Sequence, residues 1–215
     1  PESMEGIKPV LIYPLFGVLL IGVFMFAVNP TMAAINTGIT SFLNSMGGSS
    51  KILLGCIVAG MMSIDMGGPF NKAAYVFGTA SIASGNYDVM AAVMIGGMIP
   101  PLAVALATTF FKKKFTSEER KSGVVNYIMG LCFITEGVIP FAAADPLRVI
   151  PSCVAGSAVA GGLSMLFGCT LRAPHGGIFV FPVVGNVVGY LIALAAGSLV
   201  GMLLLGVLKK DKVAE

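Results

Sequence analysis

The stretch VMAAVMIGGMIPPLAVALATTFF, residues 89–111, decides the fold class of this chain. It holds 23 residues without a formal charge, and a helix of that length crosses the roughly 30 Å hydrocarbon core of a bilayer. Three more apolar stretches that can span a membrane lie at residues 10–28, 149–171 and 187–208. The sequence therefore predicts an all-α, polytopic transmembrane protein.

The composition of the chain points to the same class. Of its 215 residues, 56% are hydrophobic and 11% are charged, less than half of the charged quarter that is usual in a soluble domain. This balance excludes a soluble globule, a disordered chain and a nucleic-acid binder, and a net charge of +3 is too small to indicate an anionic partner. The four cysteines lie in apolar runs without ligand spacing, so we expect neither a disulfide nor a metal site: Cys56, Cys132, Cys153 and Cys169.

The beginning of the chain indicates a piece of a longer protein. It starts at Pro1 without an initiator Met and without the basic region of a signal peptide. The residues before Pro9 have the character of a loop that enters a helix. We therefore expect an N-terminally truncated chain.

The segments between the spans are of two kinds. Residues 31–46 carry apolar side chains at helical spacing among polar ones, which predicts an interfacial helix separated from the first span by Asn29–Pro30. Residues 52–83 and 122–148 are apolar but interrupted, and they predict broken or re-entrant segments. Residues 209–215 are predicted to form a cytoplasmic tail.

The basic clusters set the predicted orientation. Residues 112–121 and 209–212 are rich in lysine and arginine, and the positive-inside rule places both in the cytoplasm. If both clusters are cytoplasmic, the chain must cross the membrane an even number of times from one to the other. The spans at residues 149–171 and 187–208 supply two crossings, so residues 122–148 must enter and leave the membrane on the same side. The alternative, in which this segment crosses and the final 31-residue apolar stretch crosses twice, is disfavoured because 31 residues are too few for two spans.

The two interrupted segments share a pattern. An acid, Asp65 or Glu136, ends an apolar run and is followed by Pro-Phe and then by a basic residue, Lys72 or Arg148. Paired segments interrupted by Gly and Pro are typical of the discontinuous helices that build a transporter's binding site. Each charge in such a segment costs about 2.5–3.5 kcal/mol on insertion scales, which indicates ion pairing or a polar cavity.

Glu136 is the strongest candidate for a functional side chain, because no basic residue lies within six positions of it. Arg148 fits an ion pair with the acid three positions before it as well as it fits a site, and Lys72 can reach to the membrane surface. Asn71 and His175 offer an amide and an imidazole to a hydroxyl group. The alternative role of Asn71 is a helix N-cap, and the alternative for His175 is an exposed loop position without a function.

Four motifs stand in the chain in a characteristic order. They are DMGGPFNKAAY at residues 65–75, GLCFITEGVIPFA at 130–142, DPLR at 145–148 and APHGG at 173–177. In these residues the chain resembles the membrane-embedded IIC component, the permease domain, of the bacterial fructose-type phosphoenolpyruvate-dependent sugar phosphotransferase system. The resemblance covers residues 1–208 and implies a partial IIC domain, because the family has further spans before the position of Pro1.

The resemblance implies a homodimeric carrier in the bacterial inner membrane. It would bind fructose or a related hexose and present it to a phosphocysteine of the IIB component, so that the sugar is released inside as its phosphate. The phosphoryl group comes from phosphoenolpyruvate through carrier proteins, and no cofactor is bound. The expected partners are the sugar, the IIA and IIB components and membrane lipid, whereas none of the chain's own cysteines fits the phosphoacceptor.

The resemblance also implies roles for particular residues. The family places the Ile-Thr-Glu motif at the tip of a re-entrant hairpin that faces the sugar, so Glu136 is expected to orient the sugar or to act as general base. The predicted sugar-binding residues are Asp65, Asn71, Thr135, Glu136 and His175. The candidates that face the phosphate are Lys72 and Arg148.

Two other functions remain open at this point. An ion-coupled secondary transporter uses similar broken helices and buried acids, and its uptake would depend on a proton or sodium gradient without phosphoenolpyruvate. A non-transporting, truncated remnant would bind no sugar.

Overall fold

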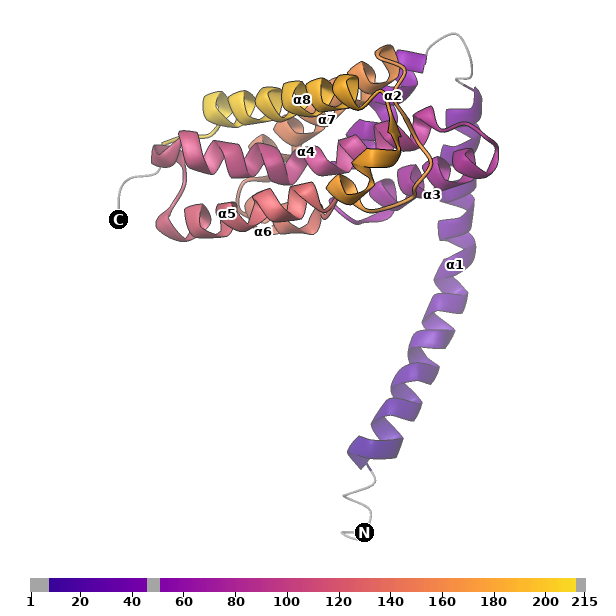
Figure 1. Cartoon of the computed structure of the whole chain (residues 1–215). Coiled ribbons are helices and arrows are strands. Elements are labelled where there is room, and N and C mark those ends of the chain that lie inside the picture. Colours follow the sequence, from indigo (N-terminus) through magenta and orange to yellow (C-terminus); the bar gives the residue numbers. More distant parts are fainter. Residues whose placement is uncertain (1–7, 46–50, 212–215) are drawn as a thin grey trace. The chain divides into compact units, whose positions relative to one another are not determined.

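The computed structural model describes residues 8–45 and 51–211, which fall into two units, residues 1–45 and 46–215 (Figure 1). The helical elements are η2 (Lys8–Ile12), α1 (Tyr13–Ser45), α2 (Lys51–Met61), α3 (Pro69–Ala83), α4 (Asp88–Phe110), η3 (Lys112–Lys114), α5 (Ser117–Leu131), η4 (Glu136–Val138), α6 (Ile139–Ala144), α7 (Pro146–Leu166), η5 (Gly177–Val183) and α8 (Val187–Leu208). Two short strands, β1 (Thr170–Leu171) and β2 (Val184–Gly185), pair antiparallel.

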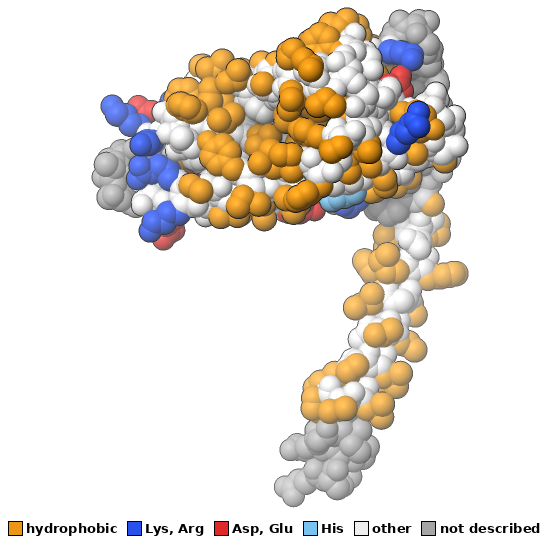
Figure 2. Space-filling model, in the orientation of Figure 1, with side chains coloured by type: hydrophobic (Ala, Val, Ile, Leu, Met, Phe, Trp, Pro, Cys, Tyr) orange, Lys and Arg blue, Asp and Glu red, His pale blue; other side chains and the backbone are white. Residues whose placement is uncertain are grey.

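Four helices within the described ranges are long and apolar enough to cross a membrane. They are Lys8–Pro30, Asp88–Phe110, Pro146–Leu166 and Val187–Leu208. Figure 2 shows hydrophobic side chains over the middle of the second unit and lysine and arginine side chains toward its two ends. The predicted all-α, polytopic class is confirmed.

The first helix runs further than the sequence predicts. α1 continues through Pro30 to Ser45. The expected boundary at Asn29–Pro30 is therefore wrong, and so is the expectation of a separate interfacial helix at residues 31–46, of which residues 31–45 belong to α1. Residue 46 lies outside the described residues. A proline removes one helical hydrogen bond, but its fixed φ suits a helix, and long apolar helices tolerate it.

α4 is the central helix of the second unit, with 94% of its apolar window buried because α2, α5, α7 and α8 pack around it (Figure 1). Pro100 lies inside this helix and lacks the N–H that would bond the carbonyl of Gly96. The Ser157 hydroxyl of α7 donates to that carbonyl at 2.8 Å, and the Ser63 hydroxyl lies 2.5 Å from the Ser157 hydroxyl. The two serines therefore tie α7 and the turn after α2 to the centre of α4.

The helices α7 and α8 follow the hairpin segment. α7 begins at Pro146 and ends at Leu166, before the expected end at residue 171, because the chain turns at Gly168 (φ 63°) and then enters β1. The β1–β2 ladder closes the base of a loop that carries His175. α8 then begins at Val187.

The segment that the sequence predicts as re-entrant, residues 122–148, covers most of a helical hairpin of α5 and α6 and ends in the first turn of α7. α5 begins at Ser117, earlier than expected, because Thr116 and Glu119 form a capping box. The Glu119 N–H donates to Thr116 Oγ1 at 3.2 Å, and the Thr116 N–H donates to Glu119 Oε2 at 2.8 Å. This Thr-x-x-Glu signature is readable in the sequence, within the basic stretch at residues 112–121.

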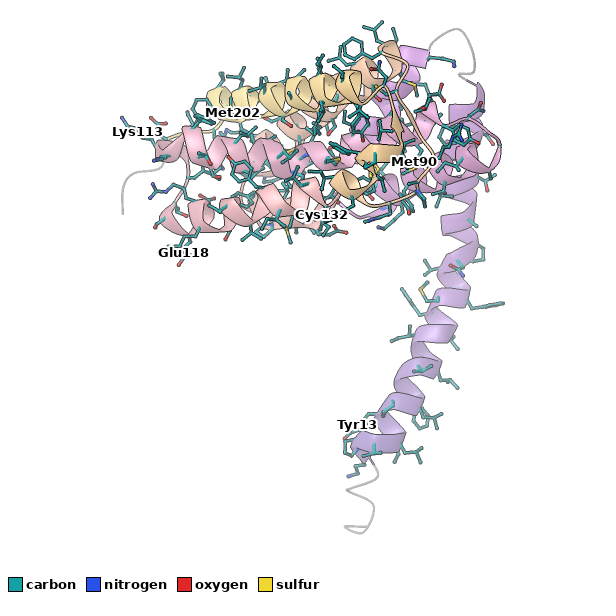
Figure 3. All side chains as sticks on the ribbon, in the orientation of Figure 1. Tyr13, Met90, Lys113, Glu118, Cys132 and Met202 are labelled. Atoms are coloured by element: carbon teal, nitrogen blue, oxygen red, sulfur yellow. The ribbon has the colours of Figure 1, made fainter. Side chains whose placement is uncertain are left out.

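Both ends of this hairpin meet at Lys209, the residue after α8. Its Nζ lies 4.9 Å from the centre of the Phe115 ring, just before α5, and 3.6 Å from Oδ2 of Asp145, just after α6. Figure 3 places Lys113 and Glu118 at the same end of α4. The chain thus enters and leaves at one end of the bundle, which we call the Lys209 end.

α2 and α3 form the other hairpin, which is the first in chain order, so that the α5–α6 hairpin is the second. The α2–α3 hairpin opens toward the opposite end of α4, where Figure 3 places Met90. Nζ of Lys51, at the start of α2, lies 3.0 Å from Oδ2 of Asp88, at the start of α4. The tip of this hairpin is the turn at residues 62–68. With 11 and 15 residues, its arms are too short to span a bilayer. Two half-length hairpins therefore enter the bundle from opposite ends.

Candidate functional site

The tips of the two hairpins meet at a cavity of about 470 Å³, a volume within the usual range of small-molecule sites. The first hairpin contributes Met62, Asn71, Lys72 and Tyr75, the second contributes Phe133, Ile134, Thr135 and Glu136, and the loop after β1 contributes His175. Five of the seven residues that the sequence singles out lie here together: Asn71, Lys72, Thr135, Glu136 and His175.

The two tips touch at Gly67 and Glu136. Gly67 has φ 115°, a conformation that side-chain-bearing residues rarely adopt. A Cβ atom at this position would lie only 2.9 Å from Oε1 of Glu136. Glycine thus allows the turn of one hairpin to reach the acid of the other.

Glu136 presents a carboxylate to the cavity. Its side chain is exposed, whereas Thr135 is buried and its hydroxyl lies 3.4 Å from Oε2 of Glu136, to which it donates. Within residues 8–45 and 51–211, no lysine or arginine forms an ion pair with Glu136. The carboxylate oxygens therefore remain available as acceptors for a ligand.

The first turn of α3 places an amide and an ammonium group at the cavity. Asn71 is only 3% exposed, and its Nδ2 donates to the carbonyl of Met62 at 2.8 Å, which fixes the amide and leaves its oxygen as an acceptor. Lys72 is exposed and has no carboxylate partner in the described part of the chain.

Aromatic rings form a further part of the cavity wall. The Phe133 and His175 rings are 5.1 Å apart in an edge-to-face arrangement, and the Tyr75 ring centre lies 6.4 Å from that of Phe133. Phe133 has φ 64°, which costs a bulky residue about 1–3 kcal/mol and is frequent at functional sites. Tyr75 and Phe133 are not among the site residues that the sequence predicts, although both lie within the motifs at residues 65–75 and 130–142.

Comparison with known proteins identifies the family. The profile of the family described as "Phosphotransferase system, EIIC" matches residues 1–156. The chain belongs to the EIIC family. This match confirms the resemblance that the four motifs indicate, and it favours this family over an ion-coupled transporter.

Several curated proteins are similar to this EIIC chain over nearly its whole length. The PTS system fructose-specific EIIABC component of Bacillus subtilis (strain 168) is 54% identical over 98% of this chain and 33% of its own length. The fructose permease IIC component of Bacillus amyloliquefaciens is 53% identical over 98% of this chain and 69% of its own length. The PTS system fructose-specific EIIB'BC component of Escherichia coli (strain K12) is 47% identical over 99% of this chain and 38% of its own length.

The EIIC chain therefore spans between one third and about two thirds of the length of these three relatives. Among solved structures, none matches it significantly.

Asp65 does not line the cavity of this EIIC chain, although the sequence predicts it as a sugar ligand. Its Oδ2 accepts the N–H of Phe70 at 2.7 Å, and its Oδ1 accepts the N–H of Asn71 at 3.0 Å. The first N–H groups of a helix lack partners within the helix, and this carboxylate satisfies two of them at the start of α3. Asp65 thus positions Asn71 and Lys72 and does not face the cavity itself.

Asp65→Ala is expected to lower the stability of the protein by about 1 kcal/mol, because two N–H groups of α3 lose their acceptor. Thermal unfolding of the complete protein in detergent measures the effect. Asp65→Asn keeps one acceptor oxygen and is expected to lose less. Unfolding temperatures for Asp65→Ala and the unsubstituted protein that coincide would contradict the capping role.

Arg148 also lies away from the cavity, at the Lys209 end of the EIIC bundle. Its Nη1 lies 3.0 Å from Oδ1 of Asp145, whose other oxygen faces Lys209. The structure therefore contains the alternative that the sequence allows for Arg148, an ion pair with Asp145. Of the two residues predicted to face a phosphate, only Lys72 lines the cavity.

The four cysteines are free thiols, and the lining of the cavity includes none of them. Cys153 and Cys169 are buried, whereas Cys56 and Cys132 are half-buried. In the described part of the EIIC chain, no three His, Cys, Asp or Glu side chains gather as a metal site.

Proposed function

We propose that this EIIC chain binds fructose in the cavity between the two hairpin tips and takes part in its transport-coupled phosphorylation. The observation that carries this proposal is the convergence of polar side chains from three separate segments on one cavity. The names of the similar proteins, which specify fructose, support the choice of sugar.

The chemistry of the lining suits a sugar. A sugar hydroxyl both donates and accepts hydrogen bonds, so the Glu136 carboxylate serves as acceptor, the Lys72 ammonium as donor and the His175 imidazole as either. Hydrogen bonds to charged groups contribute about 1.5–3 kcal/mol each. The rings of Tyr75 and Phe133 offer an apolar surface to the C–H groups of the sugar.

The same residues fit the transfer step. A sugar hydroxyl attacks the phosphorus of a phosphocysteine on the IIB component, the S–P bond breaks, and the cysteine leaves as a thiolate. Glu136 orients this hydroxyl and accepts its proton as general base, and Lys72 faces the negative phosphoryl oxygens. Phosphoryl transfer depends chiefly on such positioning and charge stabilisation, and no bound cofactor takes part.

The phosphoryl group is proposed to come from phosphoenolpyruvate through IIA and IIB components. Similar proteins are named EIIABC and EIIB'BC components, which supports these partners. The homodimer that the resemblance implies stays a prediction.

Membership of the EIIC family and the four apolar helices of the described chain indicate a membrane protein. We place it in the bacterial inner membrane with the Lys209 end in the cytoplasm, because η3 (Lys112–Lys114), Lys209 and Lys210 gather at that end and lysine-rich loops favour the cytoplasmic side. In this orientation the α5–α6 hairpin enters from the cytoplasm, and the α2–α3 hairpin enters from outside.

Reconstitution of the complete permease with its IIA and IIB components tests the function. In proteoliposomes supplied with phosphoenolpyruvate and the general phosphocarrier proteins, labelled fructose is expected to accumulate as its phosphate, and only when phosphoenolpyruvate is present. Accumulation of unmodified fructose driven by a proton or sodium gradient would contradict the proposal.

Lys72→Gln is expected to raise the KM for fructose by about tenfold or more in the same assay, because one charge-assisted hydrogen bond is worth about 1.5–3 kcal/mol. Lys113→Gln is the matched control, since it removes the same charge from an exposed position in η3 that does not line the cavity. An equal KM for the two variants would remove Lys72 from the site.

A further inference from the structure

A second cavity, of about 350 Å³, lies where the end of α4 packs against the start of α5. We propose that it binds the phosphate group of an anionic phospholipid at the Lys209 end of the bundle. Three basic side chains line it, and they come from both sides of the connection between the helices: Lys112, Arg120 and Lys121. Nothing in the sugar site or the proposed transfer step uses them.

The cavity has an uncompensated positive charge. No acidic residue lines it, and none of its three basic residues forms an ion pair with a described residue. Nε of Arg120 is buried without a hydrogen-bond partner, and an unsatisfied buried donor is unfavourable. An anion with several acceptor oxygens satisfies this donor and offsets the mutual repulsion of the three cations.

The nearby acids do not supply this charge. The Glu119 carboxylate caps the start of α5 by accepting the N–H of Thr116, and Glu118 is exposed. Neither of them lines the cavity. Ser117 adds a hydroxyl from the first turn of α5, where the partial positive charge of the helix terminus also favours an anion.

The surface beside the cavity selects a lipid over a free phosphate ion. Val124 lines the cavity and is 62% exposed, and Ile128, which lies four residues on along the same helix face, is 67% exposed. The basic cavity therefore opens onto an apolar strip that leads along α5 toward the middle of the bundle. A phospholipid matches both the basic cavity, with its headgroup, and the apolar strip, with an acyl chain. A free phosphate ion would contact the basic cavity alone.

The position of the cavity agrees with a headgroup. It lies at the end of α4, the most deeply buried of the four apolar helices in the described ranges, beside the lysines of η3. Figure 2 shows basic side chains gathered at this end of the second unit. Basic pockets between membrane helices on the cytoplasmic side bind anionic headgroups, and each nearby lysine or arginine contributes about 1 kcal/mol.

The test is lipid binding to the complete permease, purified in detergent and followed by native mass spectrometry. Phosphatidylglycerol is titrated against phosphatidylcholine, and one tightly retained phosphatidylglycerol per chain is expected at this site. Arg120→Gln and Lys121→Gln are each expected to weaken its binding by about fivefold. Lys113→Gln is the matched control, because it removes the same charge from the same end without lining the cavity, and a change below about twofold is expected.

Other outcomes would overturn the proposal. An equal loss in Lys113→Gln would mean diffuse attraction by surface charge. Inorganic phosphate that binds equally well without lipid, and displaces phosphatidylglycerol, would assign the cavity to a free anion. Unchanged lipid binding in Arg120→Gln together with a loss of IIB-dependent phosphorylation would assign it to a protein partner. If Arg120→Gln fails to fold, Lys112→Gln, at an exposed lining position, carries the same test.

Discussion

Glu136→Gln is expected to lower phosphoenolpyruvate-dependent phosphorylation of fructose by at least about 100-fold in the complete permease. Glutamine keeps the size of the side chain but removes the negative charge and the ability to accept a proton. The Glu136 carboxylate is exposed to the cavity without an ion pair among the described residues, so its loss leaves no structural charge unpaired. The measurement is the initial rate of formation of labelled fructose phosphate.

Glu118→Gln is the matched control for this experiment. It makes the same chemical change on the second hairpin, at an exposed position of α5 that does not line the sugar cavity. Its rate is expected to stay within about twofold of the unsubstituted permease, because exposed surface substitutions usually change little. The membrane yield and unfolding temperature of both variants are expected to match those of the parent. A rate for Glu136→Gln close to the parent's would remove this residue from catalysis.

Gly55→Ala is expected to destabilise the protein by about 3 kcal/mol or more. A Cβ at Gly55 of α2 would lie 2.6 Å from the carbonyl oxygen of Gly161 of α7 and against the Met165 side chain. The backbone of α7 cannot yield to it without separating the two helices, which pack through small residues as membrane helices often do. The unfolding temperature of the complete protein in detergent is expected to fall by roughly 6–12 °C.

Gly60→Ala in the same helix provides the comparison. A Cβ there would lie 3.6 Å from Cγ1 of Val154, an ordinary van der Waals contact, and alanine is the better helix former. Its unfolding temperature is expected to equal or slightly exceed that of the parent. If both variants unfold at the same temperature, the close approach of α2 and α7 at Gly55 is not what holds them together.

Much of the architecture could be predicted from the sequence because membrane insertion leaves a strong local record. The 23 uncharged residues around α4 and the Lys-rich stretch after it indicate a span and its end, since charge is costly in hydrocarbon. The interruptions near Asp65 and Glu136 indicate broken helices for the same reason. The predicted segment begins at residue 122, whereas α5 begins at Ser117, because the Thr116–Glu119 capping box starts a helix within the basic stretch. Asn29–Pro30 predicts a helix end, but α1 continues through Pro30 because the fixed φ of proline is compatible with a helix.

The sequence by itself determined that this is an all-α membrane protein with two interrupted segments, and its motifs determined the family. It could not decide which marked residues share a site, because Asp65 and Asn71 are neighbours in the chain while Asn71 and Glu136 are 65 positions apart. The tertiary structure assigned Asp65 to the cap of α3 and Arg148 to an ion pair with Asp145. It also brought the two hairpin tips together at one cavity. The physical reason is that hydropathy is a property of each segment alone, whereas the approach of two tips depends on packing between segments, such as the contact of Gly67 with Glu136.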